Sequence, residues 1–415
     1  MESCVFAEVV VFSPARASED RPAFTYDVPP ELERRVVVGS LVVVPFGTRR
    51  LYGVVVGLSD HSPVSETRSI ESLVDPQPVL TPEQIALARW MRVEYVASLY
   101  ECLELMLPPG MVGHADLRIG LEGDVPGGAA NTGDQAKLLA LLERRGPLRG
   151  TQLDAALADV DWRAASDQLA RRGIVSRESF LAPPRAQPKR VDTVRLVRET
   201  DEEAALEGLR SEYYPPILDL LKAEGGPVPV RQVYEETGCS WYHLNKLEER
   251  GLIAPGSEEV WRDPLSDEVF VPTTPPPLTS DQQAVWEPVD RAIASPASYV
   301  FLIHGVTGSG KTEIYLRAVA QVLEQGQKAV ILVPEISLTP QTVARFAGRF
   351  PDRVAVLHSA LTDGERYDTW RRARAGLIDV IVGPRSALFV PLSPLGLIVL
   401  DEEHDDSYKQ EAPRP

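Results

Sequence analysis

The sequence has few cysteines. Only three occur among 415 residues, and Cys4, Cys102 and Cys239 lie far apart without a Cys-x-x-Cys pair. Disulfide frameworks need several closely spaced cysteines, and structural zinc sites need clustered Cys and His ligands. We therefore expect no disulfide framework, and no zinc site formed by this chain alone.

Long apolar runs are absent as well. No stretch approaches the ~18 consecutive apolar residues that a transmembrane helix requires. The first residues, MESCVFAEVVVF, lack the basic start and the long apolar core of a signal peptide. We expect a cytoplasmic protein without a membrane partner.

The chain also lacks an excess of basic residues. It has 43 Lys and Arg against 60 Asp and Glu, a formal net charge of −17 at pH 7. Because DNA-binding proteins contact phosphates through Lys and Arg, this balance argues weakly against nucleic-acid binding. The charge is summed over the whole chain, however, and a local basic surface is sufficient. Nucleic-acid binding therefore stays open.

Composition and periodicity divide the first two thirds of the chain into two regions. Residues 1–112 begin with short β-branched runs broken by Gly and Pro, which predicts a small β-barrel closed by one or two helices starting at Thr81. After a Gly-rich linker, residues 130–262 contain two similar segments, 134–182 and 213–262. Each reads as three helices ending in Arg-Gly and two aliphatic residues, which predicts a repeated winged-helix-like α+β module.

The predicted third helices of these modules carry basic residues that could face DNA. They are Arg163, Arg171, Arg172, Lys246 and Arg250. The same helices carry Asp167, Glu248 and Glu249, which would repel phosphate. DNA contact and a role as spacer or protein-docking module both remain open.

A Pro-rich stretch near residue 275 precedes the third region, 276–415. Apolar runs there alternate with amphipathic helices, and we expect buried strands at SYVFLIHG, KAVILVP, RVAVLHS, DVIVG and LGLIVLD. This alternation predicts a doubly wound parallel sheet that binds ligands at the carboxyl ends of its strands. The fold class is therefore multidomain α/β.

One motif predicts a nucleotide site. The stretch GVTGSGKT comprises Gly305, Val306, Thr307, Gly308, Ser309, Gly310, Lys311 and Thr312. Its glycines let backbone N–H groups approach phosphates, and the following helix presents its positive N-terminus. Lys311 places a charge at the β- and γ-phosphates, and Thr312 supplies a hydroxyl to Mg²⁺.

The stretch LIVLDEEH supplies the second half of this site. Asp401 follows an apolar strand and is expected to hold Mg²⁺ through water, while Glu402 orients or deprotonates the hydrolytic water. Gln282, 23 residues before the loop, is placed to read an adenine edge, with Gln283 as a competing choice. His404, taken alone, is more often an ordinary surface or core residue.

Several stretches resemble the PriA family of replication restart helicases, in superfamily 2. GVTGSGKTEIYLR, LVPEISLTPQT, RSALFVP and LGLIVLDEEHDDSYKQ resemble its successive lobe-one motifs, and DEEH is similar to the DEAH form. The resemblance implies a RecA-like lobe in an ATP-dependent 3′→5′ DNA helicase that recognises stalled or repaired forks and initiates primosome assembly. It implies ATP and Mg²⁺ as cofactors, Gln282 as an adenine contact, and His404 as a link between nucleotide and DNA. The implied partners are forked and single-stranded DNA, other primosome proteins and single-stranded-DNA-binding protein.

The N-terminal region is similar to the domain of that family that holds the 3′ end of a nascent leading strand. AFTYDVP and VPFG carry the similarity, which implies that the terminal nucleotide is bound by Phe24, Thr25, Gly47 and Arg68. Thr25 stands where the family often has Asp, and a hydroxyl accepts a hydrogen bond less strongly than a carboxylate. In the C-terminal region, Pro384 stands where the family usually has a hydroxyl residue. Proline has no backbone N–H, so a contact of that group with DNA is lost at this position. Packing in a barrel core is the alternative for Phe24 and Tyr26.

In the family, a zinc module and a second helicase lobe follow these motifs. No counterpart occurs within the 415 residues, whether they are a truncated product, a deliberately shortened one or a natural split. An arginine supplied by such a lobe is worth on the order of 10³–10⁵ in rate in comparable NTPases. We expect these residues alone to bind Mg-ATP weakly, hydrolyse it slowly and not unwind DNA. The alternative is a non-enzymatic fork-DNA-binding or primosome adaptor with an incomplete ATPase.

Overall fold

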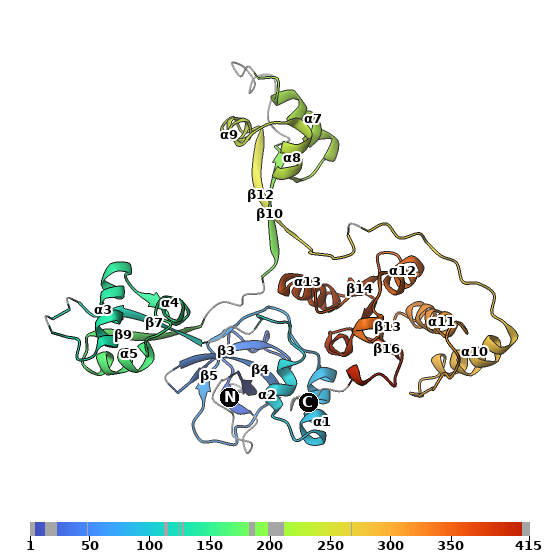
Figure 1. Ribbon diagram of the computed structural model, residues 1–415, viewed down its shortest axis with the longest axis horizontal. Helices are drawn as coiled ribbons and strands as arrows, with labels where there is room; N and C mark the ends of the chain where they lie inside the picture. The colour runs from blue at the N-terminus through green and yellow to red at the C-terminus, as the bar shows by residue number, and fades with distance from the viewer. Residues whose placement is uncertain are drawn as a thin grey trace.

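The computed structural model describes residues 5–12, 23–47, 49–111, 115–123, 125–126, 128–181, 187–197, 211–266 and 268–408. Cys4, Ala182 and residues 409–415, which belong to features predicted above, lie outside these ranges. Figure 1 shows a central body formed by the N-terminal sheet and the C-terminal lobe. The two similar segments project from that body in different directions.

A curled six-stranded sheet forms the N-terminal part. Its strands are β1 (Phe6–Val11), β2 (Phe24–Asp27), β3 (Leu41–Phe46), β4 (Arg49–Ser59), β5 (Arg68–Ser69) and β6 (Ser72–Leu73), in the order β5-β2-β1-β4-β3-β6. Although β2, β1 and β4 separate β5 from β3, Arg68 on β5 hydrogen-bonds to Gly47 just after β3. The sheet is therefore strongly curled, and its closure into a barrel stays a prediction.

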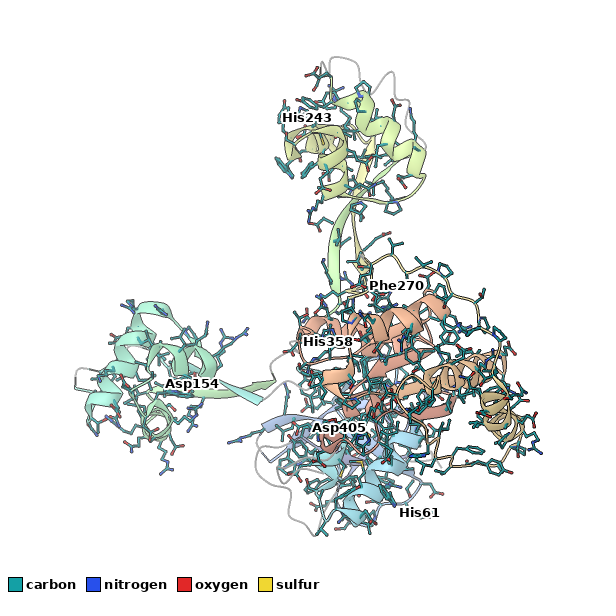
Figure 2. The ribbon with its side chains drawn as sticks, turned by 45° about the vertical axis from the view of Figure 1, so that its right-hand side comes forward. His61, Asp154, His243, Phe270, His358 and Asp405 are labelled. Carbon is teal, nitrogen blue, oxygen red and sulfur yellow. The ribbon has the colours of Figure 1, made fainter. Side chains whose placement is uncertain are left out.

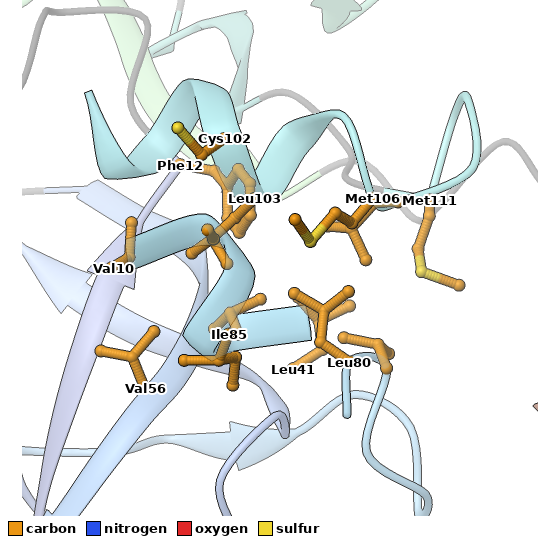
Figure 3. Packing of buried hydrophobic residues seen from close by; sticks show 14 of the residues in the cluster. Val10, Phe12, Leu41, Val56, Leu80, Ile85, Cys102, Leu103, Met106 and Met111 are labelled. Atoms are coloured by element: carbon orange, nitrogen blue, oxygen red, sulfur yellow. The ribbon is translucent and has the colours of Figure 1, made fainter. Parts of the chain in front are cut away.

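Two helices cover this sheet, and each begins at a cap formed by side chains three residues apart. Helix α1 (Pro82–Glu94) begins after Thr81, whose hydroxyl accepts from the N–H of Gln84 while the Gln84 side chain accepts from the N–H of Thr81. Helix α2 (Leu99–Glu104) begins with the same reciprocal cap at Ser98. The predicted start at Thr81 is confirmed. Figure 3 shows the core beneath these helices, where Val10, Phe12, Leu41 and Val56 of the sheet meet Ile85, Cys102, Leu103 and Met106.

The two projecting segments share one order of elements: strand, helix, strand, helix, helix, strand. The first has β7 (Ala115–Leu121), α3 (Gly133–Arg145), β8 (Leu148–Arg149), α4 (Gly150–Ala156), α5 (Trp162–Arg171) and β9 (Val175–Leu181). The second has β10 (Lys189–Leu196), α7 (Tyr214–Glu224), β11 (Val228–Pro229), α8 (Val230–Thr237), α9 (Trp241–Glu249) and β12 (Ile253–Val260). Their antiparallel sheets have matching orders, β8-β7-β9 and β11-β10-β12. We refer to them as the first and second repeat.

A parallel sheet forms the centre of the C-terminal lobe. Its strands are β13 (Lys328–Leu332), β14 (Val354–Val356), β15 (Val380–Gly383) and β16 (Leu395–Leu400), in the order β14-β15-β13-β16. The helices are α10 (Ser280–Ile293), α11 (Lys311–Glu324), α12 (Pro340–Arg349) and α13 (Asp363–Arg374). Alternate side chains of β13 enter two cores, Ala329 and Ile331 on one face and Val330 and Leu332 on the other. Helices cover both faces, as predicted.

The expected buried strand at SYVFLIHG is wrong. Residues 298–304 form no strand, and Val300 is fully exposed. In the described sheet, β13 already has β15 and β16 as neighbours, while Ile398 and Leu400 on the end strand β16 are partly exposed. An apolar run becomes a strand only when it pairs with another backbone, and residues 298–304 are not paired with the open edge of β16 or with any other described strand.

The Pro-rich stretch before the lobe is attached rather than free. The N–H of Thr273 donates to the carbonyl of Gly348 at 2.9 Å, and Arg317 Nη2 donates to the carbonyl of Pro276 at 2.5 Å. The stretch therefore runs along α11 and α12. Within the described ranges, no helix has the length and apolar character needed to cross a membrane.

Candidate functional site

The glycine-containing loop ends directly at helix α11. Gly308 and Gly310 have φ values of 81° and 86°, in the left-handed region where glycine carries no steric penalty. Gly310 is the residue before α11, so the helix N-terminus opens onto the loop. Lys311 Nζ donates to the carbonyl oxygens of Gly305 at 2.8 Å and Val306 at 3.3 Å. A phosphate group would replace these carbonyls as the partner of the ammonium.

Gln282 reaches this loop from α10. Its Oε1 accepts from the N–H of Thr279 at 3.0 Å in a capping box, and its Nε2 donates to the carbonyl of Ser309 at 2.9 Å. A Cβ on Gly310 would collide with the same amide group. The Gln283 side chain is exposed. Of the two glutamines considered, the structure therefore brings Gln282 to the loop, and its contact with adenine stays a prediction.

Asp401 and Glu402 occupy a tight turn at the carboxyl end of β16. The N–H of Asp401 donates to the carbonyl of Leu332 at 2.9 Å, which aligns the turn with the end of β13. Glu402 has a φ of 48°, a conformation that costs a non-glycine residue about 1–3 kcal/mol and is found mainly at functional sites. Burial and, secondly, the Glu402 charge raise the pKa of Asp401, while the Lys311 charge opposes this rise. The positive charge of Lys311 is therefore close enough to Asp401 to affect its pKa.

Two tyrosines lie beside Asp401, and neither was predicted from the sequence. The Tyr315 side chain on α11 lies near the Asp401 carboxylate, whose charge contributes to raising the pKa of Tyr315. Burial is the main cause that raises the pKa of Tyr315 to about 12, so this hydroxyl keeps its proton. Tyr408 Oη donates to the carbonyl of Asp401 at 2.7 Å. The position of Tyr315 one turn after Lys311, in KTEIY, was the available signal.

The other predicted residues of this site are less constrained. Thr312 is half-buried in the first turn of α11. His404 is exposed, and its Nδ1 lies 3.7 Å from a Glu402 carboxylate oxygen. Pro384 precedes the 3-10 helix η2 (Arg385–Phe389), and its carbonyl accepts from the N–H of Ala387 at 2.8 Å. The structure therefore brings His404 beside Glu402.

The donor set fits a magnesium–nucleotide. It comprises an ammonium, a hydroxyl, a half-buried carboxylate and the N-terminus of a helix. The loop has glycines where the backbone must turn, as a phosphate cradle requires. Among the residues that the structure describes, no group of three or more His, Cys, Asp and Glu side chains could hold a metal ion by itself.

A second candidate site is a cavity on the curled sheet, which we call the sheet cavity. Its volume is about 260 Å³, and it is lined by Phe24, Thr25, Tyr26, Pro45, Phe46, Gly47, Val64, Glu66, Thr67 and Arg68. All four residues predicted for a DNA end, Phe24, Thr25, Gly47 and Arg68, belong to this lining. The rings of Phe24 and Phe46 meet edge to face, with centroids 5.1 Å apart. Arg68 Nη1 donates to the carbonyl of Gly47 at 2.6 Å, which joins the two sides of the cavity.

The two aromatic residues of AFTYDVP have different surroundings. Tyr26 is 4% exposed and belongs to a buried cluster, and its hydroxyl donates to the carbonyl of Pro45 at 3.1 Å. Burial raises the pKa of Tyr26 to about 12, with Arg68 opposing the rise. Phe24 is only half-buried and has one side in the cavity. Tyr26 is therefore a core residue, whereas Phe24 packs against the core and also lines the cavity. The sequence analysis missed Phe46 and Glu66, although Phe46 stands in the quoted VPFG.

Several basic residues named on the repeats are engaged in local ion pairs. Arg163 binds both oxygens of Asp154, at 2.7 and 2.9 Å, and lies over the Trp162 ring. Arg171 pairs with Asp167 at 2.7 Å, and Lys246 with Glu249 at 2.5 Å. Figure 2 shows Asp154 and His243 on the two projecting repeats, apart from the central body. These pairs lower the positive charge available to phosphates.

Comparison with known proteins gives two family matches. A 3′DNA-binding domain (3′BD) model matches residues 8–108, and a DEAD/DEAH box helicase model matches residues 279–413. Replication restart protein PriA of Bacillus subtilis is 36% identical over 412 residues, which is 98% of this chain and 50% of that protein. The Synechocystis protein of the same name is 33% identical over 405 residues, covering 94% of this chain and 47% of that protein. The chain thus spans about half the length of these relatives.

Proposed function

This chain belongs to the PriA family of replication restart proteins, and from that premise we propose that it takes part in an ATP-dependent 3′→5′ DNA helicase. The helicase would recognise stalled or repaired replication forks and initiate primosome assembly. Residues 1–112 would hold the DNA end, residues 130–262 would contact or space the fork arms, and residues 276–415 would bind ATP. Primosome proteins and single-stranded-DNA-binding protein are the proposed protein partners, in the cytoplasm.

One observation carries the proposal for the N-terminal region. Four residues predicted from the sequence, up to 44 positions apart, line one cavity of about 260 Å³. An aromatic pair offers a stacking surface that accepts any base, since every base has a π-face. We propose that Phe24 stacks on the terminal base, that Thr25 and the backbone at Gly47 bind the 3′-hydroxyl, and that Arg68 faces the nearest phosphate.

The proposed work of the nucleotide site is divided among the residues that meet there. Residues 305–310 place backbone N–H groups around the phosphates, and Lys311 binds the β- and γ-phosphates. Thr312 and Asp401 hold Mg²⁺, which offsets the phosphate charge when bound. Glu402, on its strained turn, orients the hydrolytic water. Gln282 contacts the adenine edge, and His404 links the site to DNA.

The test of DNA-end recognition compares two forked DNAs that differ only at the leading-strand 3′ end. One carries a 3′-hydroxyl and the other a 3′-phosphate, and affinity is measured by fluorescence anisotropy at fixed salt. We expect tighter binding of the hydroxyl end, and we expect the Phe24→Ala variant to lose affinity for both by about 1–3 kcal/mol of stacking. Equal affinity of the wild-type chain for the two ends would refute end recognition.

The nucleotide proposal is tested separately with residues 1–415. We propose that they bind Mg-ATP weakly and hydrolyse it very slowly, because the strained turn and the loop are exposed. A fluorescent ATP analogue should bind the wild-type chain and not the Lys311→Ala variant. DNA-stimulated hydrolysis at the ~1–10³ s⁻¹ of ordinary enzymes would contradict slow hydrolysis.

Binding to forked DNA, measured with and without nucleotide, tests the alternative of a fork-binding adaptor. An adaptor needs no nucleotide, so its binding to forked DNA should be the same with and without Mg-ADP and in the Lys311→Ala variant. The positive φ values of Gly308 and Gly310 directly before α11, and the influence of the Lys311 charge on the pKa of Asp401, favour a working nucleotide site. Zinc, expected in the full-length family, is not assigned to any residue of this chain.

A further inference from the structure

Another cavity lies where the N-terminal domain, the start of the second repeat and the C-terminal lobe meet. Its volume is about 170 Å³, and we call it the junction cavity. It shares no described lining residue with the sheet cavity, and no residue assigned to the nucleotide site lines it. The junction cavity is therefore a candidate site separate from the two described above.

The wall of the junction cavity is mostly apolar. Leu41, Val79 and Met111 line it, and each is 3% exposed or less. Figure 3 shows Leu41 and Met111 in the core beneath α1 and α2, so the cavity is continuous with that core. Val74 lines it from a partly buried position, and the exposed Gln187 gives it an opening to solvent. An apolar cavity of about 150 Å³ is large enough to bind benzene, so this one suits a molecule with a single ring.

Tyr367 of α13 brings a hydroxyl group to this wall. The residue is 9% exposed, and its ring stacks on the Trp370 ring with centroids 6.4 Å apart. Within the described ranges, the Tyr367 hydroxyl has no hydrogen-bond partner. Burial raises the pKa of Tyr367, so the hydroxyl keeps its proton at neutral pH. A buried hydroxyl without a partner is unfavourable, and a ligand with an acceptor atom would receive its hydrogen bond.

The charged group of the lining already has partners. Asp75 Oδ2 accepts from Arg374 Nη2 at 2.9 Å, and Asp75 Oδ1 accepts from the N–H of Gln77 at 2.9 Å. A cationic ligand would compete with Arg374 for this carboxylate, and an anionic ligand would be repelled by it. The surroundings therefore favour a neutral ligand.

We propose that the junction cavity binds a small neutral molecule that has one apolar ring and one acceptor atom for the Tyr367 hydroxyl. The inference goes beyond the proposed function and does not depend on it. Because the walls come from three parts of the chain, a ligand that fills the cavity stabilises their joined arrangement.

The methionine methyl groups provide the readout. The chain has four methionines, of which Met111 lines the cavity, whereas Met91 and Met106 lie in the same core outside the lining. Residues 1–415 with isotope-labelled methionine methyls are titrated with ethylbenzene and with acetophenone, two probes of similar shape that differ by a carbonyl group. We expect both probes to shift the NMR signal of Met111 saturably, and to leave those of Met91 and Met106 nearly unchanged.

Tyr367→Phe tests the hydrogen bond. It keeps the ring and removes only the hydroxyl, so ethylbenzene should still bind. The affinity for acetophenone relative to that for ethylbenzene should fall by about 2–10-fold, the worth of one hydrogen bond. This ratio cancels the difference in hydrophobicity between the probes.

Val74→Phe tests the cavity, because the larger ring fills it from its partly buried edge. Val43→Phe is the matched control: Val43 is also partly buried and packs against the same core, but it does not line the cavity. We expect Val74→Phe to lose the Met111 response to both probes and Val43→Phe to keep it. Unchanged Met91 and Met106 signals in each variant show that the core is folded.

Three outcomes overturn the inference. They are a Met111 signal that neither probe shifts up to its solubility limit, a Val74→Phe variant that binds like the wild-type chain, and an affinity ratio that Tyr367→Phe leaves unchanged. In the wild-type chain, saturating acetophenone should also slow hydrogen exchange in α13 and in residues 73–80. Unchanged exchange there would contradict stabilisation of the junction.

Discussion

At the scale of single residues, the sheet cavity, proposed to bind a DNA end, contains two opposite charges. Among its described lining residues, Glu66 is the one carboxylate and Arg68 the one guanidinium. A 3′-phosphate brings negative charge to Glu66, whereas a 3′-hydroxyl can donate a hydrogen bond to it. We expect Glu66→Gln to bind 3′-phosphate forks several-fold more tightly than the wild-type chain, and so to lose preference for the hydroxyl end. Anisotropy titrations with the two forks measure this ratio.

Glu71 provides the control for this prediction. It is also an acidic residue of the same domain, but it pairs with Arg50 at 2.8 Å and does not line the cavity. Glu71→Gln removes the same charge and should change the affinity for both forks equally. The same preference in Glu66→Gln as in the wild-type chain would show that Glu66 does not select the end.

The sequence predicted residues whose role depends on the local backbone. Gly308 and Gly310 have the positive φ values that a phosphate loop requires, and the strand ends directly before Asp401. It did not show that Tyr315 lies near Asp401, because the two residues are 86 positions apart. It also left Gln282 and Gln283 as competitors, since the contact that separates them spans 27 residues.

At the scale of elements, the two repeats place the first tryptophan of similar helices differently relative to their cores. Trp162 is 2% exposed and Trp241 is 69% exposed, although each is the first residue of its helix. Trp162 precedes the buried Leu169 by seven residues, about two full turns, whereas Trp241 precedes the buried Leu247 by six. The difference of one residue turns Trp241 away from the core.

This difference predicts unequal effects of the same substitution. Trp162→Ala should destabilise the first repeat by about 3–5 kcal/mol, because it empties a filled core position. Trp241→Ala should leave the stability of the second repeat nearly unchanged. Hydrogen exchange of the amides in α3 and α5, against α7 and α9, measures each repeat within the intact chain. A similar loss of protection in both variants would contradict the assignment of faces.

Helix starts could be predicted from neighbouring residues, whereas membership of a sheet could not. Thr81 and Ser98 start α1 and α2 through side-chain caps that the sequence alone displays. The apolar run at 298–304 has the composition of a strand, yet it forms none. Hydrophobicity selects the candidates for strands, but a neighbouring backbone decides which of them form.

At the scale of the whole molecule, α13 joins three parts of the chain. Tyr367 and Trp370 on this helix pack into the core shared by the curled sheet, α1 and α2. Arg371 binds Glu259 on β12 of the second repeat at 2.8 Å, and the buried Asp368 binds Arg262 at 3.1 Å. These contacts connect the DNA-end domain and the second repeat to the lobe that carries the nucleotide site. They span 106 or more residues, so no local pattern revealed them.

The contact between Asp75 and Arg374 offers a test of this junction by charge exchange. Arg374 Nη2 lies 2.9 Å from Asp75 Oδ2, with side chains 15% and 21% exposed, and the guanidinium covers the Trp370 ring. Asp75→Arg places two cations together at a mostly buried contact, which should cost about 3–5 kcal/mol and separate the domains. The expected result is faster hydrogen exchange in α13 and in residues 73–80, with a larger radius of gyration in X-ray scattering.

Adding Arg374→Asp to this variant restores opposite charges and should reverse both changes. Arg366→Ala, on the same helix but bonded to His358 and Ser359 within the lobe, should leave the dimensions unchanged. If Asp75→Arg scatters like the wild-type chain, or if the double variant fails to recover, α13 does not hold the two domains together through this pair.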